Sequence, residues 1–345
     1  MTREDTLELL TAFCRAHSPT GHEDEIDPLV IAEFERRGYQ PTIDSAGNIY
    51  VIRPGRGQGR IIITAHKDEI GVIVKRIDHD GRLQVRPVGG ALPWVYGEGP
   101  MDVLGDDAVV PGILSFGSRH TSAETSGFSA RTAPLTWDMA WIDTLRSPAA
   151  LDDMGVHIGS KAVVARSRKT PVVIGNYVAS YALDDKAAMV VLFDLLDQVA
   201  EVETNAELVF AVTSEEEIGV VGASWLAARL PADVMLAIEV GPVANEYHTI
   251  GDDRPVILMQ DSQNLYDERV ARELTTAAAN LEMGVQYACL ASFGSDASIS
   301  AKYGHTARPA CVAFATENTH GFEIAHFGGL LNCARLIAEY LRQFG

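Results

Sequence analysis

One stretch constrains the fold of this chain more than any other. Residues 208–212 form a continuous apolar run with β-branched side chains, which is typical of a buried strand. Glu215, Glu216 and Glu217 follow it almost at once. A strand that ends in acids places them at the carboxyl edge of an open α/β sheet, where such sheets hold their sites. Because adjacent carboxylates repel one another, the cluster is either fully solvated or lies beside a positive group.

The rest of the chain favours an α/β architecture with an insertion. Apolar strand patterns alternate with helical patterns at both ends of the sequence, which predicts a mostly parallel sheet with helices on both faces. Between about residues 70 and 165 short β-rich pieces are separated by Gly, Pro and Asp, with almost no helical periodicity. This block predicts a small inserted β-domain. Within it, residues 118–132 are rich in Ser, Thr and Gly and predict a loop.

Bulk composition narrows the partners and the compartment. The net charge of −19 argues against nucleic acid and anionic membranes as partners. The first residues lack the basic and apolar regions of a signal peptide, and no apolar run is long enough to span a bilayer, so we expect a cytoplasmic protein. The four cysteines contain no CxxC pair, which disfavours a zinc-thiolate site or a disulfide framework.

The chemistry-bearing residues lie at the ends of the expected strands. In a parallel sheet, strand ends of this kind meet at one edge. The residues concerned are His66 with Asp68, Asp184 with Asp185, Glu216 with Glu217, and Glu239, with His320 as a further candidate. Two histidines and several carboxylates without cysteine form a nitrogen and oxygen donor set, which suits zinc, cobalt or manganese. One carboxylate shared by two ions would give a dinuclear centre.

Each piece also has a plainer interpretation. The acidic turn could be solvated surface, and the histidine at a strand end could simply be hydrogen-bonded to Asp68. Asp184 and Asp185 could cap a helix and complement its dipole. The order and the strand-end placement of all the residues together favour the metal site.

The motifs resemble those of the tetrahedral metallo-aminopeptidase family, which includes deblocking and glutamyl aminopeptidases and some members described as endoglucanases. The matching motifs are His66-x-Asp68-Glu69-Ile70-Gly71, Leu183-Asp184-Asp185-Lys186, Glu216-Glu217-Ile218-Gly219 and His320-x-x-Glu323. The resemblance implies a phosphorylase/hydrolase-like α/β catalytic domain over residues 1–69 and 166–345, and an inserted PDZ-like dimerisation domain over residues 70–165. It also implies a homo-oligomeric shell of about twelve subunits built from dimers.

The resemblance further implies roles for individual residues. His66, Asp184 and Glu239 would bind one divalent metal ion, and Asp184, Glu217 and His320 a second, with Asp184 as the bridge. Glu216 would be the general base, and Asp68 would orient His66. Zinc or cobalt is expected at both positions, with manganese as the alternative. The implied reaction is the release of N-terminal residues from short peptides.

Three positions depart from the family pattern. Glu239 replaces the usual Asp, Lys186 replaces Arg, and Gly321 replaces a common Ser. None removes a metal ligand, but lysine lacks the bidentate fork of arginine. A metal-dependent deacylase or another hydrolase, and a catalytically silent assembly protein, therefore remain alternatives. The preferred N-terminal residue does not follow from the sequence.

Overall fold

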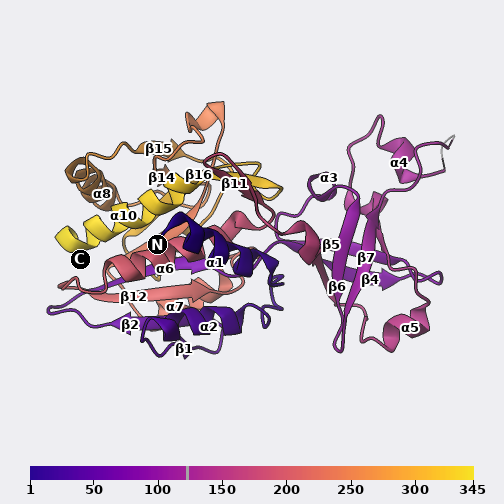
Figure 1. Ribbon diagram of the computed structural model, residues 1–345, viewed down its shortest axis with the longest axis horizontal. Helices are drawn as coiled ribbons and strands as arrows, with labels where there is room; N and C mark the ends of the chain where they lie inside the picture. The colour runs from indigo at the N-terminus through magenta and orange to yellow at the C-terminus, as the bar shows by residue number, and fades with distance from the viewer. Residues whose placement is uncertain (122–123) are drawn as a thin grey trace.

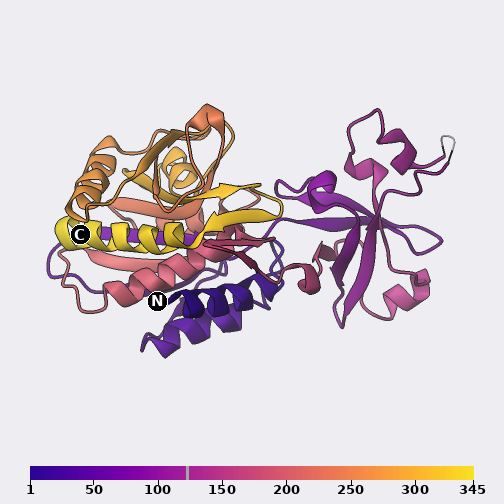
Figure 2. The same ribbon diagram turned by 45° about the horizontal axis from the view of Figure 1, so that its top comes forward.

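The computed structural model describes residues 1–121 and 124–345 and consists of two units (Figure 1). A mixed α/β unit, here called the body, holds both chain ends, and a smaller barrel lies beside it along the longest axis (Figure 2). Positions 122 and 123 of the predicted 118–132 loop lie outside the described residues. The described part of that loop contains a short helix, α4 (Ser126–Ser129), which the prediction missed.

The sheet of the body has a parallel centre and antiparallel edges. Within the described residues its eleven strands are β1 (Thr42–Ile43), β2 (Ile49–Arg53), β3 (Arg60–His66), β10 (Val172–Ile174), β11 (Tyr177–Ser180), β12 (Glu207–Thr213), β13 (Val234–Pro242), β14 (Val256–Gln260), β15 (Gln286–Cys289), β16 (Pro309–Glu317) and β17 (Glu323–His326). The strands β12, β3, β13 and β16 are parallel neighbours in that order. The β1–β2 side and the β17–β11–β10 side are antiparallel, so the sheet is mixed.

Helices cover both faces of this sheet, as predicted. One face carries α1 (Arg3–Arg15), α2 (Asp27–Arg36), α6 (Leu183–Gln198), α8 (Glu268–Asn280) and α10 (Phe327–Phe344), and the other carries α7 (Val221–Arg229) and α9 (Asp296–Lys302). Strand β3 shows why the sequence gives this arrangement. Its alternate residues Ile61 and Ile63 pack on the first face, and Ile62 packs on the second. A strand buried on both faces has to be mostly apolar, and residues 61–63 of β3 form an unbroken run of isoleucine.

The inserted segment folds into a closed barrel. Its strands, among the residues described, are β4 (Gly71–Ile77), β5 (Leu83–Val88), β6 (Gly99–Leu104), β7 (Val109–Ser115), β8 (Trp141–Asp143) and β9 (Lys161–Val164). The short helices α3 (Pro93–Tyr96) and α5 (Pro148–Asp152) and the 3₁₀ turns η1 (Trp137–Met139) and η2 (Arg166–Arg168) fill the connections. The barrel has its own apolar core. The chain enters it directly from β3.

Two details of the body differ from the sequence-based expectations. Glu239 does not follow a strand end, because β13 continues to Pro242 and Glu239 lies inside it. The central strand β16, which leads towards His320, was not anticipated. A third 3₁₀ turn, η3 (Asn245–Tyr247), follows β13. In the described part of the chain, none of the helices combines the length and apolarity that crossing a bilayer requires.

Candidate metal centre

The carboxyl ends of the central strands gather the expected side chains. His66 is the last residue of β3, and Thr213 at the end of β12 is its neighbour across the ladder. Glu216 and Glu217 follow β12 in a turn where Glu215 adopts a φ of 51°. Glu239 comes from β13 and is 3% exposed.

Potential ligand atoms form two groups that share Asp184. The first group contains His66, Asp184, Asp185 and Glu239, and the second contains Asp184, Glu217 and His320, with the atoms of each group within 4.8 Å of one another. The two oxygens of Asp184 face different histidines. Oδ1 lies 3.0 Å from Nε2 of His66, and Oδ2 lies 3.4 Å from Nε2 of His320. This arrangement suits a carboxylate that bridges two cations.

Asp68 connects His66 to the acidic turn. Its Oδ1 lies 3.3 Å from Nδ1 of His66. The backbone N–H groups of Glu216 and Glu217 donate to its two oxygens at 2.9 and 3.1 Å, and the hydroxyl of Thr20 donates at 2.8 Å. Burial alone would raise the pKa of Asp68, but the hydrogen bonds, His66 first, lower it overall. Asp68 therefore stays an anion that holds both the imidazole ring and the turn.

Glu216 lies next to the first group without belonging to either one. Its Oε2 is 4.0 Å from Nε2 of His66, and its side chain is 12% exposed. Burial raises the pKa of Glu216 well above its ordinary value, and the charge of Glu217 adds to the rise. A carboxylate with a raised pKa at the edge of a donor cluster is suited to accepting and returning a proton.

The cluster is short of positive charge. Burial, reinforced by neighbouring carboxylates, raises the pKa values of Glu239 and Asp185 strongly and that of Glu217 to about 7. Burial would lower the pKa of His320, but Asp184 and Glu217 raise it to about 10. Oδ1 of Asp185 is buried without a hydrogen-bond partner among the described residues. These observations and the nitrogen and oxygen donor set fit divalent cations.

Three acidic residues near the cluster had no assigned role. Asp185 joins the first group, and its Oδ2 accepts from the backbone N–H of His66 at 3.0 Å. Glu323 accepts from the N–H groups of Asp184 and His320 at 3.0 and 2.9 Å, so it positions residues of both groups. Asp296 accepts from the hydroxyl of Thr213. Asp185 and Glu323 stood inside recognised motifs, whereas Asp296 follows Gly294 and Ser295 at the start of α9 and gave only a weak signal.

Lys186, which departs from the family pattern, lies behind the cluster. It is fully buried, and its Nζ donates to the hydroxyl of Ser18 and the carbonyl of Lys67. Burial lowers its pKa. The carbonyl of Lys67 follows His66 directly in the chain, so Lys186 braces the end of β3 with a point charge in place of an arginine fork.

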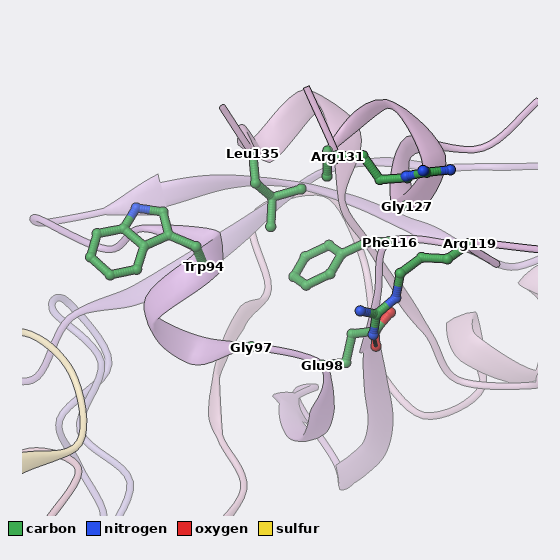
Figure 3. Close-up of a pocket in the computed structure, with 9 residues that line it drawn as sticks. Trp94, Gly97, Glu98, Phe116, Arg119, Gly127, Arg131 and Leu135 are labelled. Carbon is green, nitrogen blue, oxygen red and sulfur yellow. Dashed lines mark ion pairs between the residues drawn. The ribbon is translucent and has the colours of Figure 1, made fainter. Parts of the chain in front are cut away.

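The donor cluster opens into a cavity of about 520 Å³ between the body and the barrel. The barrel contributes Gly90, Leu92, Trp94 and Val95 to its wall. A separate cavity of about 410 Å³ lies within the barrel side, with Phe116 and Leu135 facing it and Arg119 and Arg131 at its edge (Figure 3). Among residues 1–121 and 124–345, Trp94 alone lines both cavities, and the second cavity holds none of the residues of the two donor groups.

An α/β body with a cluster of nitrogen and oxygen donors at its strand ends is typical of metal-dependent hydrolases. Comparison with known proteins identifies the family as one of peptidases. The model of the M42 glutamyl aminopeptidase family matches residues 47–336. The chain belongs to this family and is a peptidase.

Three relatives illustrate the range of the family. The chain is 23% identical to the glutamyl aminopeptidase of Lactococcus lactis over 72% of its own length and 69% of the relative's. It is 26% identical to the lysyl aminopeptidase of Pyrococcus furiosus, over 68% and 66%. The structure of the TET1 peptidase of Pyrococcus horikoshii superposes on this chain with a TM-score of 0.87 and 24% identity, over 98% of this chain and 100% of that one. That peptidase can assemble into a tetrahedron or a large octahedral shell.

Proposed function

We propose that the protein is a dinuclear metal-dependent aminopeptidase that releases N-terminal residues from short peptides. The observation that carries this proposal is the placement of Asp184, whose two oxygens face His66 and His320 on opposite sides. A carboxylate in this position can hold two ions a few ångströms apart, as in two-metal hydrolases. His66 and Glu239 would complete one site and Glu217 and His320 the other, and Asp185 is a further oxygen donor to the first.

The remaining residues have roles that follow from their contacts. When bound, divalent ions lower the pKa of a coordinated water and polarise the scissile carbonyl. Glu216 takes the proton from the attacking water and delivers it to the leaving amine. Asp68 fixes the tautomer and orientation of His66, and its Oδ1 also accepts from the backbone N–H of Glu216, which keeps Glu216 in place. Zinc or cobalt is the proposed metal, with manganese as the alternative.

The barrel is proposed to be a dimerisation domain over residues 70–165, set into a catalytic domain over residues 1–69 and 166–345. Strand β7 supports this role, because its outward-facing Val109 and Ile113 are 49% and 44% exposed. Apolar residues of this kind on one face are typical of interaction surfaces. Together with the assemblies of the TET1 peptidase, this supports a homo-oligomer, which we propose to be a dodecamer in the cytoplasm.

The test is hydrolysis of dipeptides and aminoacyl anilides by chelator-treated protein, before and after addition of zinc, cobalt or manganese. Activity that returns with metal and requires a free α-amine supports the aminopeptidase. Equal cleavage of N-acetylated and free peptides would instead indicate a deacylase or another hydrolase on this scaffold. Protein that binds no metal and cleaves nothing would indicate a silent assembly protein.

A further inference from the structure

The lining of the metal-bearing cavity points to a substrate class that sequence similarity leaves open. Two relatives named for glutamyl and for lysyl residues match this chain about equally well, at 23% and 26% identity. Similarity therefore does not select a charge for the N-terminal side chain. We propose that this enzyme accepts uncharged, apolar N-terminal residues and discriminates against both acidic and basic ones. This inference rests on the proposed aminopeptidase function.

In the described part of the chain, the titratable side chains that line the cavity are members of the two donor groups or Glu216 beside them. They are His66, Asp184, Glu216, Glu217, Glu239 and His320. Among the other lining residues, all of them in the described part of the chain, lysine, arginine, aspartate and glutamate are absent. Four apolar side chains come from the body, Val240, Pro242, Phe293 and Ile299, and three come from the barrel, Leu92, Trp94 and Val95. The polar side chains there, Gln263, Ser292 and Thr319, are uncharged.

The apolar wall begins where the substrate's first side chain must project. The amine and the scissile carbonyl have to lie at the donor cluster, and Val240 and Pro242 continue β13 directly beyond Glu239. The same wall is tightly packed around Gly294. A Cβ at Gly294 would lie 3.1 Å from both Cγ of Gln263 and Cδ1 of Ile299, so glycine leaves room for these two side chains.

A charged side chain in this space would lose hydration without gaining an oppositely charged partner from the wall, which is unfavourable for either sign. One cation, Lys302, contacts a residue of the wall, because its Nζ donates to Oε1 of Gln263 at 2.7 Å. Lys302 is exposed to solvent and does not line the cavity. An apolar side chain, in contrast, gains by burial against the wall.

The first measurement is kcat/KM of the metal-loaded enzyme for leucyl, methionyl, glutamyl and lysyl anilides. We expect the leucyl and methionyl substrates to exceed the two charged ones by about 100-fold or more, because a wall without matching groups discriminates on this scale. A glutamyl or lysyl substrate that reacts as well as leucyl overturns the inference, while the aminopeptidase function itself stands.

A charge-swap pair at Ser292 tests the wall directly. Ser292 lines the cavity and is exposed, so it tolerates a longer side chain. Ser292→Lys should raise the glutamyl-to-leucyl ratio by about 10-fold, and Ser292→Glu should raise the lysyl-to-leucyl ratio similarly. Ser167→Lys, an exposed serine of η2 that does not line the cavity, is the matched control and should leave both ratios unchanged. Unchanged ratios in the Ser292 pair contradict the proposal.

Binding separates this inference from the proposed function. The hydroxamates of leucine, glutamate and lysine can be titrated into zinc-loaded protein by calorimetry, whether or not any peptide is cleaved. Tighter binding of the leucine compound supports the apolar subsite even if hydrolysis fails. Equal or tighter binding of a charged compound, or no binding of any of the three, overturns it.

Discussion

Gly90 of the barrel lies directly against the imidazole ring of His320. A Cβ at this position would be 2.3 Å from Nδ1 and 2.5 Å from Cε1 of His320, distances that no side chain can occupy. The preceding Gly89 is also close to the cluster, because a Cβ there would lie 3.1 Å from Cβ of Glu217. The barrel backbone thus packs directly against the second donor group, and only glycine leaves enough space at position 90.

Gly90→Ala should therefore displace His320. We expect the affinity for the metal ion of the second donor group to fall by about 10- to 100-fold, as it does when a residue that orients a metal ligand is removed. The value of kcat should fall in parallel. Metal titration followed by activity measurement tests this. Gly251→Ala is the control, because a Cβ there meets only ordinary contacts at 3.7 and 4.0 Å. Unaltered binding of two ions by Gly90→Ala would contradict the assigned contact.

Substitution of Asp184 should affect metal content more than substitution of any other donor, because Asp184 belongs to both groups. Asp184→Asn is expected to retain fewer than about one ion per chain after dialysis, whereas His320→Ala should retain about one. Elemental analysis by mass spectrometry gives both values. Equal metal loss in the two variants would argue against a shared carboxylate.

Glu216→Gln should separate catalysis from metal binding. Since Glu216 belongs to neither donor group, the variant should bind as many ions as the unmodified protein. Its kcat should fall by about 10²- to 10⁴-fold, the usual contribution of a general base. KM for an anilide substrate should change little. A variant with normal kcat would contradict the role of Glu216 as the general base.

The metal-free protein should become less stable as pH rises. Burial, with the charge of Asp184, raises the pKa of Glu217 from 4.5 to about 7, and Asp184 and Glu217 raise that of His320 from 6.5 to about 10 against the effect of burial. Both folded-state values lie above those of the unfolded chain. The folded protein therefore binds more protons over this range, and its stability falls as pH rises from about 4.5 to about 10.

Thermal unfolding of chelator-treated protein at about pH 5.5 and about pH 8 tests this, with a lower Tm expected at the higher pH. Saturating zinc should remove the difference, because bound cations take the place of the extra protons. A metal-free Tm that rises between these two pH values would contradict the electrostatic account.

Local sequence patterns predicted several strands of the body and the site residues at their ends. The apolar run before Glu216 and the run before His66 are buried strands, and their carboxyl ends meet because the strands are parallel neighbours. The same pattern identified Glu239, although Glu239 does not follow the end of β13. It lies within that strand and belongs to the first donor group. The acidic turn is not plain solvated surface, because Glu216 and Glu217 are largely buried there.

Contacts between segments that are distant in the chain could not be predicted from sequence patterns. The approach of Gly90 to His320 joins residues that are separated by most of the chain, and no periodicity or spacing encodes it. The role of Glu323 was hidden for a related reason, because its two oxygens reach the backbone of residues in different segments. Strand β16 was missed although it ends on Glu317, because its several alanines weaken the β-branched and aromatic signal by which a strand is recognised.

The order of the donor groups along the chain has a consequence for biosynthesis. A ribosome delivers His66 first and Asp184 and Glu239 much later, and His320 emerges only as the last strands and helix α10 are being made. Gly90, which contacts His320 in the folded protein, has left the ribosome long before that point. The second proposed metal site therefore cannot exist on a partly synthesised chain. Synthesis itself delays the proposed two-metal activity until the segment that carries His320 has been made and folded.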